Sequence, residues 1–316
     1  MSCISRIKPR RLRPGDTIGV IAPASPGDPE LAIAGIRWLE EQGFKVQLGT
    51  TVGQTLGYLS GTDAARAADI NAMFASPDID GIICLRGGYG TMRLLDLLDY
   101  NMIRAHPKVF VGYSDITALH ISIGQYTGLV TFHGPMVASD MGKGLPDYTW
   151  DYFMRAVTAV EPLGAICNPP LASDPLFITP GTARGYLTGG NLSLIAATMG
   201  TPYEIDTYGK ILFLEEVGEA PYRIDRMLTQ LLLAGKLQSA AGIVFDMCTG
   251  CDSEATPPSF TIEEVLHERL GGLNKPVLYN LYFGHTPDKA TLPLGVMARL
   301  ASATDGLEII ESATTG

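Results

Sequence analysis

The sequence predicts an α/β protein built from two successive α/β parts. In the first half, short apolar runs rich in β-branched residues alternate with segments of helical period. A stretch rich in Pro, Ala and Gly follows, and a second series of strand and helix signals comes after it. Because parallel strands need a crossover connection, usually a helix, the alternating first half predicts a parallel sheet with helices on both faces. For the second half we expect a mixed sheet.

Each element of the first half has its own signal. Strands are predicted for the buried apolar runs, and helices for segments whose apolar residues recur at helical spacing. Thr62 can cap one of these helices, and Gly43 suits the position just after another. The predicted strands cover residues 17–23, 45–48, 81–85 and 108–112, and the predicted helices residues 30–41, 64–73 and 94–98, with a further helix after Ser114.

The second half continues with the same kinds of signal. The predicted strands cover residues 210–214, 242–247 and 276–281, and the predicted helices residues 191–199, 222–233 and 262–270. We therefore expect an N-terminal domain over residues 1–161, a linker over residues 162–185 and a C-terminal domain over residues 186–316.

Composition narrows the class of protein. The chain has 316 residues, of which 46% are hydrophobic and 18% charged, and its formal net charge is −10. This length suffices to bury a large core without disulfides. The acidic balance argues against a nucleic-acid or anionic-membrane partner. The sequence shows no run of about 18 uncharged apolar residues and no apolar signal segment in its basic N-terminus, so we expect a cytoplasmic protein.

Cysteine spacing gives little support for a metal site. Cys248 and Cys251 have C-x-x-C spacing, but no second pair and no nearby histidine pair completes a zinc site. The five scattered cysteines do not resemble a disulfide framework either. We expect these two residues to be reduced thiols on a loop, and we predict neither a metal nor a cofactor.

The most informative segment is the strand-to-helix corner at Ser114. An apolar run over residues 108–112 ends in Gly-Tyr-Ser-Asp, and a helical pattern starts at once. A serine on such a corner projects from the backbone beside free helix N–H groups, which is the geometry of a nucleophile elbow. The match is partial, because Ile116 stands where the hydrolase motif has glycine. Alternatively, Ser114 or Asp115 simply caps the next helix.

Three polar residues follow the ends of three predicted strands, namely Ser114, Glu215 and His285. Open α/β sheets build ligand crevices at the carboxyl ends of their strands. Such a set suffices for acyl transfer, because histidine takes the serine proton and the carboxylate orients the imidazole. His285 could instead be a loop histidine with local hydrogen bonds. Glu216 competes with Glu215, but alternation along the strand lets only one of them face the site, and we predict that Glu215 binds His285.

Two glycine-rich turns also lie near strand ends. Residues 86–90 read Arg-Gly-Gly-Tyr-Gly, and Gly189-Gly190-Asn191 opens a helix. Such loops can present backbone N–H groups to an oxyanion. They can equally be tight turns that need glycine for its backbone angles. The first loop lacks the G-x-G-x-x-G pattern and a following Lys-Ser/Thr, so a nucleotide site has little support.

Several segments occur in the order of one family's motifs. They are RPGD at 13–16, IGVIAP at 18–23, RGGYG at 86–90, GYSD at 112–115, HGPM at 133–136, GGNL at 189–192, LEE at 214–216, YRIDR at 222–226 and GHT at 284–286. Together they resemble the LD-carboxypeptidases, serine peptidases that include murein tetrapeptide carboxypeptidase and the microcin C self-immunity peptidase. The resemblance covers nearly the whole chain.

The resemblance implies a fold and a catalytic triad. The fold would be an N-terminal flavodoxin-like domain and a C-terminal swivelling-type domain, with the site between them. Ser114 would be the nucleophile, His285 the general base and Glu215 its orienting carboxylate.

The same resemblance implies further roles in the site. The backbone N–H groups of Gly88 and Asp115 would form the oxyanion hole, and Arg86, Gly190 and Asn191 would contact the substrate. The implied reaction cleaves an L,D-peptide bond and releases C-terminal D-Ala from a murein tetrapeptide in peptidoglycan recycling. Family members are commonly homodimers, and no metal or cofactor is implied.

Two alternatives to this function are kept. One is a microcin C-type self-immunity peptidase that acts on a peptidyl- or aminoacyl-nucleotide, for which Trp150 would offer an aromatic surface. The other is a non-catalytic α/β binding protein that has kept the pocket and lost the chemistry.

Overall fold

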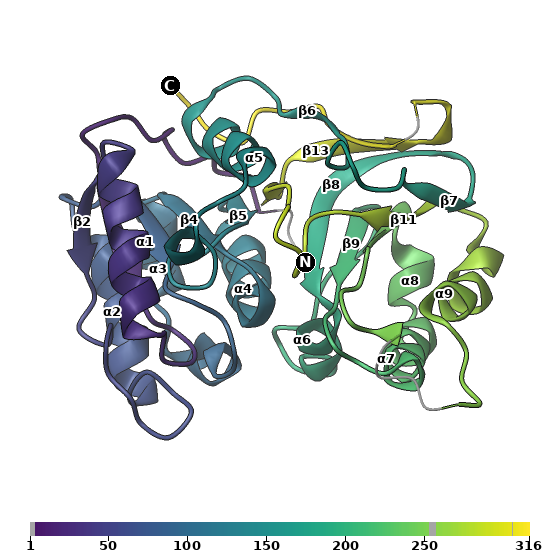
Figure 1. Ribbon diagram of the computed structural model, residues 1–316, viewed down its shortest axis with the longest axis horizontal. Helices are drawn as coiled ribbons and strands as arrows, with labels where there is room; N and C mark the ends of the chain where they lie inside the picture. Colours follow the sequence, from purple (N-terminus) through teal and green to yellow (C-terminus); the bar gives the residue numbers. More distant parts are fainter. Residues whose placement is uncertain (1–3, 253–256, 305) are drawn as a thin grey trace.

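The structure is a computed structural model that describes residues 4–252, 257–304 and 306–316. It contains two β-sheets, each accompanied by helices, which lie beside each other in the molecule (Figure 1). The α/β fold class predicted from the sequence, with one mostly parallel sheet and one mixed sheet, is confirmed.

The first sheet has six strands and is parallel except at one edge. In spatial order its strands are β12 (Leu292–Leu294), β5 (Thr131–His133), β4 (Val109–Gly112), β3 (Gly81–Cys84), β1 (Thr17–Ile21) and β2 (Lys45–Leu48). The pairs from β5 to β2 are all parallel. Consequently the carboxyl ends of these strands meet at one edge of the sheet, as the sequence predicts.

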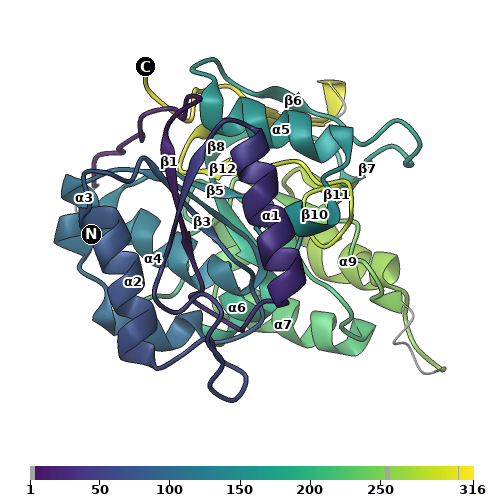
Figure 2. The same ribbon diagram turned by 60° about the vertical axis from the view of Figure 1, so that its left-hand side comes forward.

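Helices cover both faces of this sheet (Figure 2). One face packs on α1 (Pro29–Glu41) and α5 (Asp147–Thr158), and the other on α2 (Asp63–Ala75), α3 (Tyr100–Ala105) and α4 (Thr117–Thr127). Alternation along the strands explains this division, because Ile83 and Val111 belong to the first core while Ile82 and Phe110 belong to the second. The helix predicted over residues 94–98 is a 3₁₀ helix, η1 (Thr91–Leu97).

The second sheet has eight strands and is mixed. In spatial order they are β6 (Gly164–Ile166), β14 (Gly306–Ile309), β13 (Met297–Ala301), β8 (Thr182–Asn191), β9 (Ile211–Glu215), β10 (Gly242–Asp246), β11 (Val277–Leu281) and β7 (Leu176–Thr179). The four strands from β8 to β11 are parallel, and the outer pairs are antiparallel. One face packs on α6 (Leu192–Ala197), α7 (Pro221–Leu233), α8 (Lys236–Ser239) and α9 (Ile262–Leu270).

The two sheets share one hydrophobic core. Phe213 and Val244 of the second sheet belong to the same buried cluster as Val20 and Val111 of the first. The chain also returns to the first sheet near its end, because β12 pairs antiparallel with β5 and places Leu292 opposite His133.

The predicted linker contains regular structure. Residues 162–185 include β6, β7 and the start of β8, all of which belong to the second sheet. The two edge strands, β6 and β7, lack a sustained sequence pattern because they pair on one side only, and the residues of β7 are half-buried or exposed. In the described residues no helix is long and apolar enough to cross a membrane.

Candidate active site

Ser114 occupies a strained corner between β4 and α4. Its φ is +63°, a left-handed conformation that costs a non-glycine residue energy and that clusters at functional sites. The corner is tight, since a Cβ on Gly112 would lie 2.9 Å from the side chain of Ile116. The strained backbone predicted for a nucleophile elbow is therefore confirmed.

The alternative role of Ser114 and Asp115 as helix caps is not what the structure shows. Neither 3₁₀ helix η2 (Ser114–Ile116) nor α4 has a side-chain capping hydrogen bond. The Asp115 carboxylate instead accepts a hydrogen bond from the backbone N–H of Thr91, at 2.9 Å. It thereby ties the elbow to the end of the glycine-rich loop at residues 86–90.

His285 and Glu215 form a short charge-assisted pair. The imidazole Nδ1 lies 2.7 Å from Glu215 Oε2, and Glu215 is fully buried at the end of β9. Burial raises the pKa of the Glu215 carboxyl, but the nearby His285 charge and the hydrogen bond outweigh it, so the pKa lies below its ordinary value. Burial likewise opposes protonation of His285, yet Glu215 raises the pKa of the imidazole overall. The predicted contact between Glu215 and His285 is confirmed.

Glu216 points away from the imidazole, as strand alternation predicts. One oxygen accepts hydrogen bonds from the Ser193 N–H and hydroxyl, at 2.9 and 2.7 Å. The other accepts from Asn191 Nδ2 and the Val217 N–H, at 3.1 and 3.0 Å. Glu216 thus fixes the start of α6.

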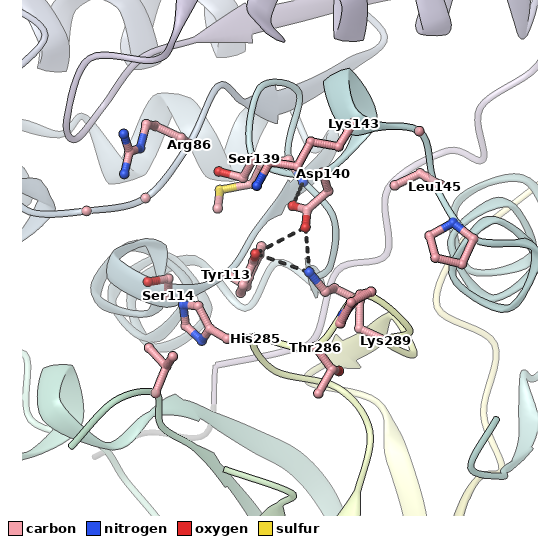
Figure 3. A pocket seen from close by; sticks show the side chains of 17 residues that line it. Arg86, Tyr113, Ser114, Ser139, Asp140, Lys143, Leu145, His285, Thr286 and Lys289 are labelled. Atoms are coloured by element: carbon pink, nitrogen blue, oxygen red, sulfur yellow. Dashed lines mark hydrogen bonds and ion pairs between the residues drawn. The ribbon is translucent and has the colours of Figure 1, made fainter. Parts of the chain in front are cut away.

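A cavity of about 570 Å³ joins the nucleophile to the histidine. Ser114 and His285 both line it, although they come from different sheets (Figure 3). In this view Ser114 and His285 lie on one side of Tyr113, and the side chains of Asp140 and Lys289 lie on its other side. The cavity is therefore built where the carboxyl ends of strands from both sheets face each other.

The glycine-rich loop brings backbone close to Ser114. A Cβ on Gly87 would lie 3.0 Å from the Ser114 Cβ, and Gly88 has a φ of +111°. A Cβ on Gly88 would also lie 2.4 Å from Ser25 Oγ, so the position of Gly88 requires glycine, while that of Gly87 leaves little room for a side chain. Arg86 lines the cavity and donates one hydrogen bond to the Pro26 carbonyl, at 3.2 Å.

Two predicted substrate contacts are not at the cavity. Gly190 and Asn191 are buried and do not line it. A Cβ on Gly190 would lie 2.4 Å from Thr117 Oγ1, and the Asn191 N–H donates to the same oxygen at 2.9 Å. Asn191 also caps α6 by accepting from the Leu194 N–H, at 3.1 Å. These residues pack the end of β8 against the first residue of α4.

A buried carboxylate that was not among the predicted site residues lies next to Glu215. Asp246 ends β10, the strand beside β9, and accepts a hydrogen bond from the Phe283 N–H at 3.2 Å. Burial, followed by the charge of Glu215, raises the pKa of Asp246 to about 7. A Cβ on Gly284 would lie only 2.2 Å from Asp246 Oδ2. The sequence does contain a signal for Asp246, since this residue ends an apolar strand just as Glu215 does.

A second missed group links the serine corner to the histidine loop. Lys289 Nζ lies 2.5 Å from Asp140 Oδ1 and donates to the Tyr113 hydroxyl at 3.1 Å. The Tyr113 ring packs edge-on against the His285 imidazole, with 5.0 Å between ring centroids. No spacing in the sequence indicates this cluster, because its members lie far apart in the chain.

Further contacts hold the loop that carries His285 against the first half of the chain. His133 Nε2 lies 3.0 Å from the Phe283 carbonyl oxygen. The Thr149 hydroxyl donates to the Pro287 carbonyl at 3.0 Å and accepts from the Lys289 N–H at 2.9 Å. The histidine is thus held relative to Ser114 by backbone contacts on both sides of it.

The expectation of two reduced thiols is wrong. Cys248 and Cys251 form a disulfide, with their Cα atoms 5.8 Å apart. Both side chains are buried in the same core cluster as residues of α7 and α9. Within the parts of the chain that the structure describes, no group of three or more His, Cys, Asp or Glu side chains could hold a metal ion.

Comparison with known proteins agrees with the geometry. Residues 18–134 match the model of the LD-carboxypeptidase N-terminal domain, and residues 184–300 that of the C-terminal domain. The chain is 43% identical over 302 residues to the probable murein peptide carboxypeptidase of Bacillus subtilis, covering 94% of this chain and 92% of that protein.

Solved structures give the same result. MccF in complex with glutamyl sulfamoyl guanosine has a TM-score of 0.91 at 29% identity, covering 98% of this chain and 99% of that one. Muramoyltetrapeptide carboxypeptidase from Oxalobacter formigenes has a TM-score of 0.82 at 31% identity, covering 95% and 100% of the two chains. The chain therefore belongs to the LD-carboxypeptidase family of serine peptidases.

Proposed function

We propose that this protein cleaves an L,D-peptide bond with Ser114 as nucleophile, His285 as general base and Glu215 as its orienting carboxylate. One observation carries this proposal. A strained serine shares a cavity with a histidine whose Nδ1 is bound, at 2.7 Å, by a buried carboxylate. Glu215 would fix the tautomer that leaves Nε2 free to accept the serine proton, and would stabilise the imidazolium that forms.

The remaining steps use groups beside the serine. The oxyanion would be held by the backbone N–H groups of Gly88 and Asp115, and one such donor contributes about 3 kcal/mol to transition-state stabilisation. Protonated His285 then delivers its proton to the departing amine, and a water resolves the acyl-enzyme. Arg86 is proposed to contact the substrate, since this residue lines the cavity.

The proposed substrate is a murein tetrapeptide that loses its C-terminal D-Ala in peptidoglycan recycling. The names of the Bacillus subtilis and Oxalobacter formigenes proteins support this choice. The similarity to MccF keeps a peptidyl- or aminoacyl-nucleotide as the alternative. However, Trp150 does not line the cavity, and its indole donates to Gln42 at 3.1 Å. Trp150 therefore does not supply the aromatic surface at the cavity that would favour a nucleotide.

A direct assay tests this function. Wild-type protein is incubated with a murein tetrapeptide and, separately, with an aminoacyl-sulfamoyl nucleoside, and released D-Ala or free amino acid is measured. We expect D-Ala release, and we expect Ser114→Ala to lower it by several orders of magnitude with the fold intact. Turnover of the aminoacyl-sulfamoyl nucleoside without turnover of the tetrapeptide would favour the microcin C-type alternative. Binding of either compound without turnover would indicate a non-catalytic binding protein.

We also propose a cytoplasmic homodimer that takes a small peptide and no nucleic acid. The net charge of −10 supports the proposal that nucleic acid is not a partner. Light scattering after size-exclusion chromatography tests the assembly, and a mass near twice 33.8 kDa is the expected result.

A further inference from the structure

The cavity is basic although the chain is acidic. Its charged wall residues, apart from His285, are Arg86, Lys143, Lys289 and the single carboxylate Asp140. Since the whole chain carries a formal charge of −10, this is a local reversal of sign. A wall of this kind attracts an anionic ligand.

Lys289 is not the cation that such a ligand would meet. Its ammonium pairs with Asp140, contacts the Tyr113 hydroxyl and lies 4.5 Å from the centre of the Tyr113 ring. The residue is only 3% exposed. Its charge is already compensated within the protein, so Lys289 serves to hold the wall together.

Lys143 differs from Lys289 in both its pairing and its exposure. It ends the 3₁₀ helix η3 (Met141–Lys143), its side chain is exposed, and within the described residues its ammonium has no hydrogen bond or ion pair. Figure 3 shows the side chain lying along the wall of the cavity above Asp140, on the same side as Arg86. Lys143 therefore offers the cavity an uncompensated positive charge.

The backbone that carries Lys143 is held firmly. A Cβ on Gly142 would lie 2.2 Å from the Leu31 carbonyl oxygen, so this segment packs directly on the backbone of α1. Asp140 accepts a hydrogen bond from the Met136 N–H at 2.9 Å and so closes the turn before it. The charge is thus presented from a fixed support, and little ordering is needed when a ligand binds.

We propose that Lys143 binds the free C-terminal carboxylate of the peptide substrate and so restricts cleavage to the last residue. This inference rests on the proposed function. The amine that leaves must lie beside His285, which protonates it, and Lys143 lines the same cavity as His285. The carboxylate of a single leaving residue is one carbon from that amine, whereas a longer peptide would place a neutral amide there.

The test compares two substrates that differ only in this charge. One is an L,D-peptide ending in D-Ala with a free carboxylate, and the other is the same peptide ending in a carboxamide. kcat/KM is measured for both with the wild type, Lys143→Met and Lys143→Arg. A matched control is Lys45→Met, which removes an exposed lysine that does not line the cavity.

We expect Lys143→Met to lower kcat/KM for the acid about ten- to a hundredfold, the range for a charge-assisted hydrogen bond. The amide should be cleaved as by the wild type, so the preference for the acid disappears. Lys143→Arg should retain most of the preference for the acid. Lys45→Met should leave kcat/KM for both peptides unchanged.

Other results would overturn the inference. Equal losses on acid and amide would mean that Lys143 acts only on the structure of the wall. An unchanged preference in Lys143→Met, with the preference lost in Arg86→Met, would assign the carboxylate to Arg86 instead. If the wild type cleaves neither peptide, the proposed function fails. If it cleaves the acid and Lys143→Met retains the preference, only this inference fails.

Discussion

Replacing Glu215 by glutamine isolates the contribution of its charge. The Nδ1–Oε2 distance of 2.7 Å and the full burial of Glu215 define a close pair shielded from water. Opposite charges about 4 Å apart interact by roughly 4 kcal/mol at an effective dielectric constant of about 20. Because each 1.36 kcal/mol changes a rate about tenfold, losing this term when the imidazolium forms should lower kcat by about a thousandfold.

The same substitution predicts a shift in the pH profile. In the wild type Glu215 raises the pKa of His285, and a general base must be neutral to act, so activity rises as pH increases through that pKa. Glu215→Gln removes the cause, so the acidic limb of kcat/KM should move to lower pH. Steady-state kinetics between pH 4 and 9 measures both effects. A kcat within about tenfold of the wild type, with an unmoved acidic limb, would refute the reasoning.

Glu216→Gln is the matched control. Its carboxylate accepts four hydrogen bonds at the start of α6 and does not contact His285. A glutamine NH₂ would face N–H donors there, which costs about 1–3 kcal/mol of stability. We therefore expect a lower melting temperature and a kcat close to that of the wild type. A thousandfold loss of kcat in this variant would move the orienting carboxylate to Glu216.

Three further predictions concern the surroundings of the site. Gly284→Ala should lower kcat about a hundredfold, because its Cβ would lie 2.2 Å from Asp246 Oδ2 and displace His285; a normal kcat would contradict this. Burial lowers the pKa of His120 to about 3 and of His133 to about 4, so both stay neutral in the fold while the unfolded chain binds protons below about pH 6.5. The free energy of unfolding should therefore fall between pH 6.5 and 4, by up to about 1.4 kcal/mol per pH unit for each histidine, whereas a flat profile in denaturant titrations would argue against neutral buried imidazoles. Dialysis against EDTA should leave peptidase activity unchanged, and a loss restored by zinc would contradict the absence of metal ligands in the described part of the chain.

The placement of Ser114, Glu215 and His285 could be predicted because it depends on local patterns. Ser114 lies just beyond the end of an apolar strand and Glu215 is the last residue of another, and the parallel order of those strands places such residues at one edge of each sheet. The choice of Glu215 over Glu216 followed from strand alternation alone. His285 comes soon after the apolar strand β11, and this position was a comparable sequence signal for a site residue.

The rest of the site depends on tertiary contacts that no short segment encodes. Asp140 and Lys289 are 149 residues apart, and only the folded chain brings them together. Gly190 and Asn191 lie in a motif of the right kind, yet packing against Thr117 turns them away from the cavity. The strands within residues 162–185 were missed because edge strands carry no alternating pattern strong enough to detect.

The placement of β12 also has a consequence for synthesis of the chain. The first sheet has its outer edge at β5 until residues 292–294 pair with it, and these residues are the last part of that sheet to leave the ribosome. Until then the main-chain groups on the free side of β5 are unpaired, which is the feature that promotes contact between nascent chains. A chain that ends before residue 292 should therefore leave one side of β5 unpaired even though every other strand of that sheet is present, and this free edge is a site at which such chains can associate.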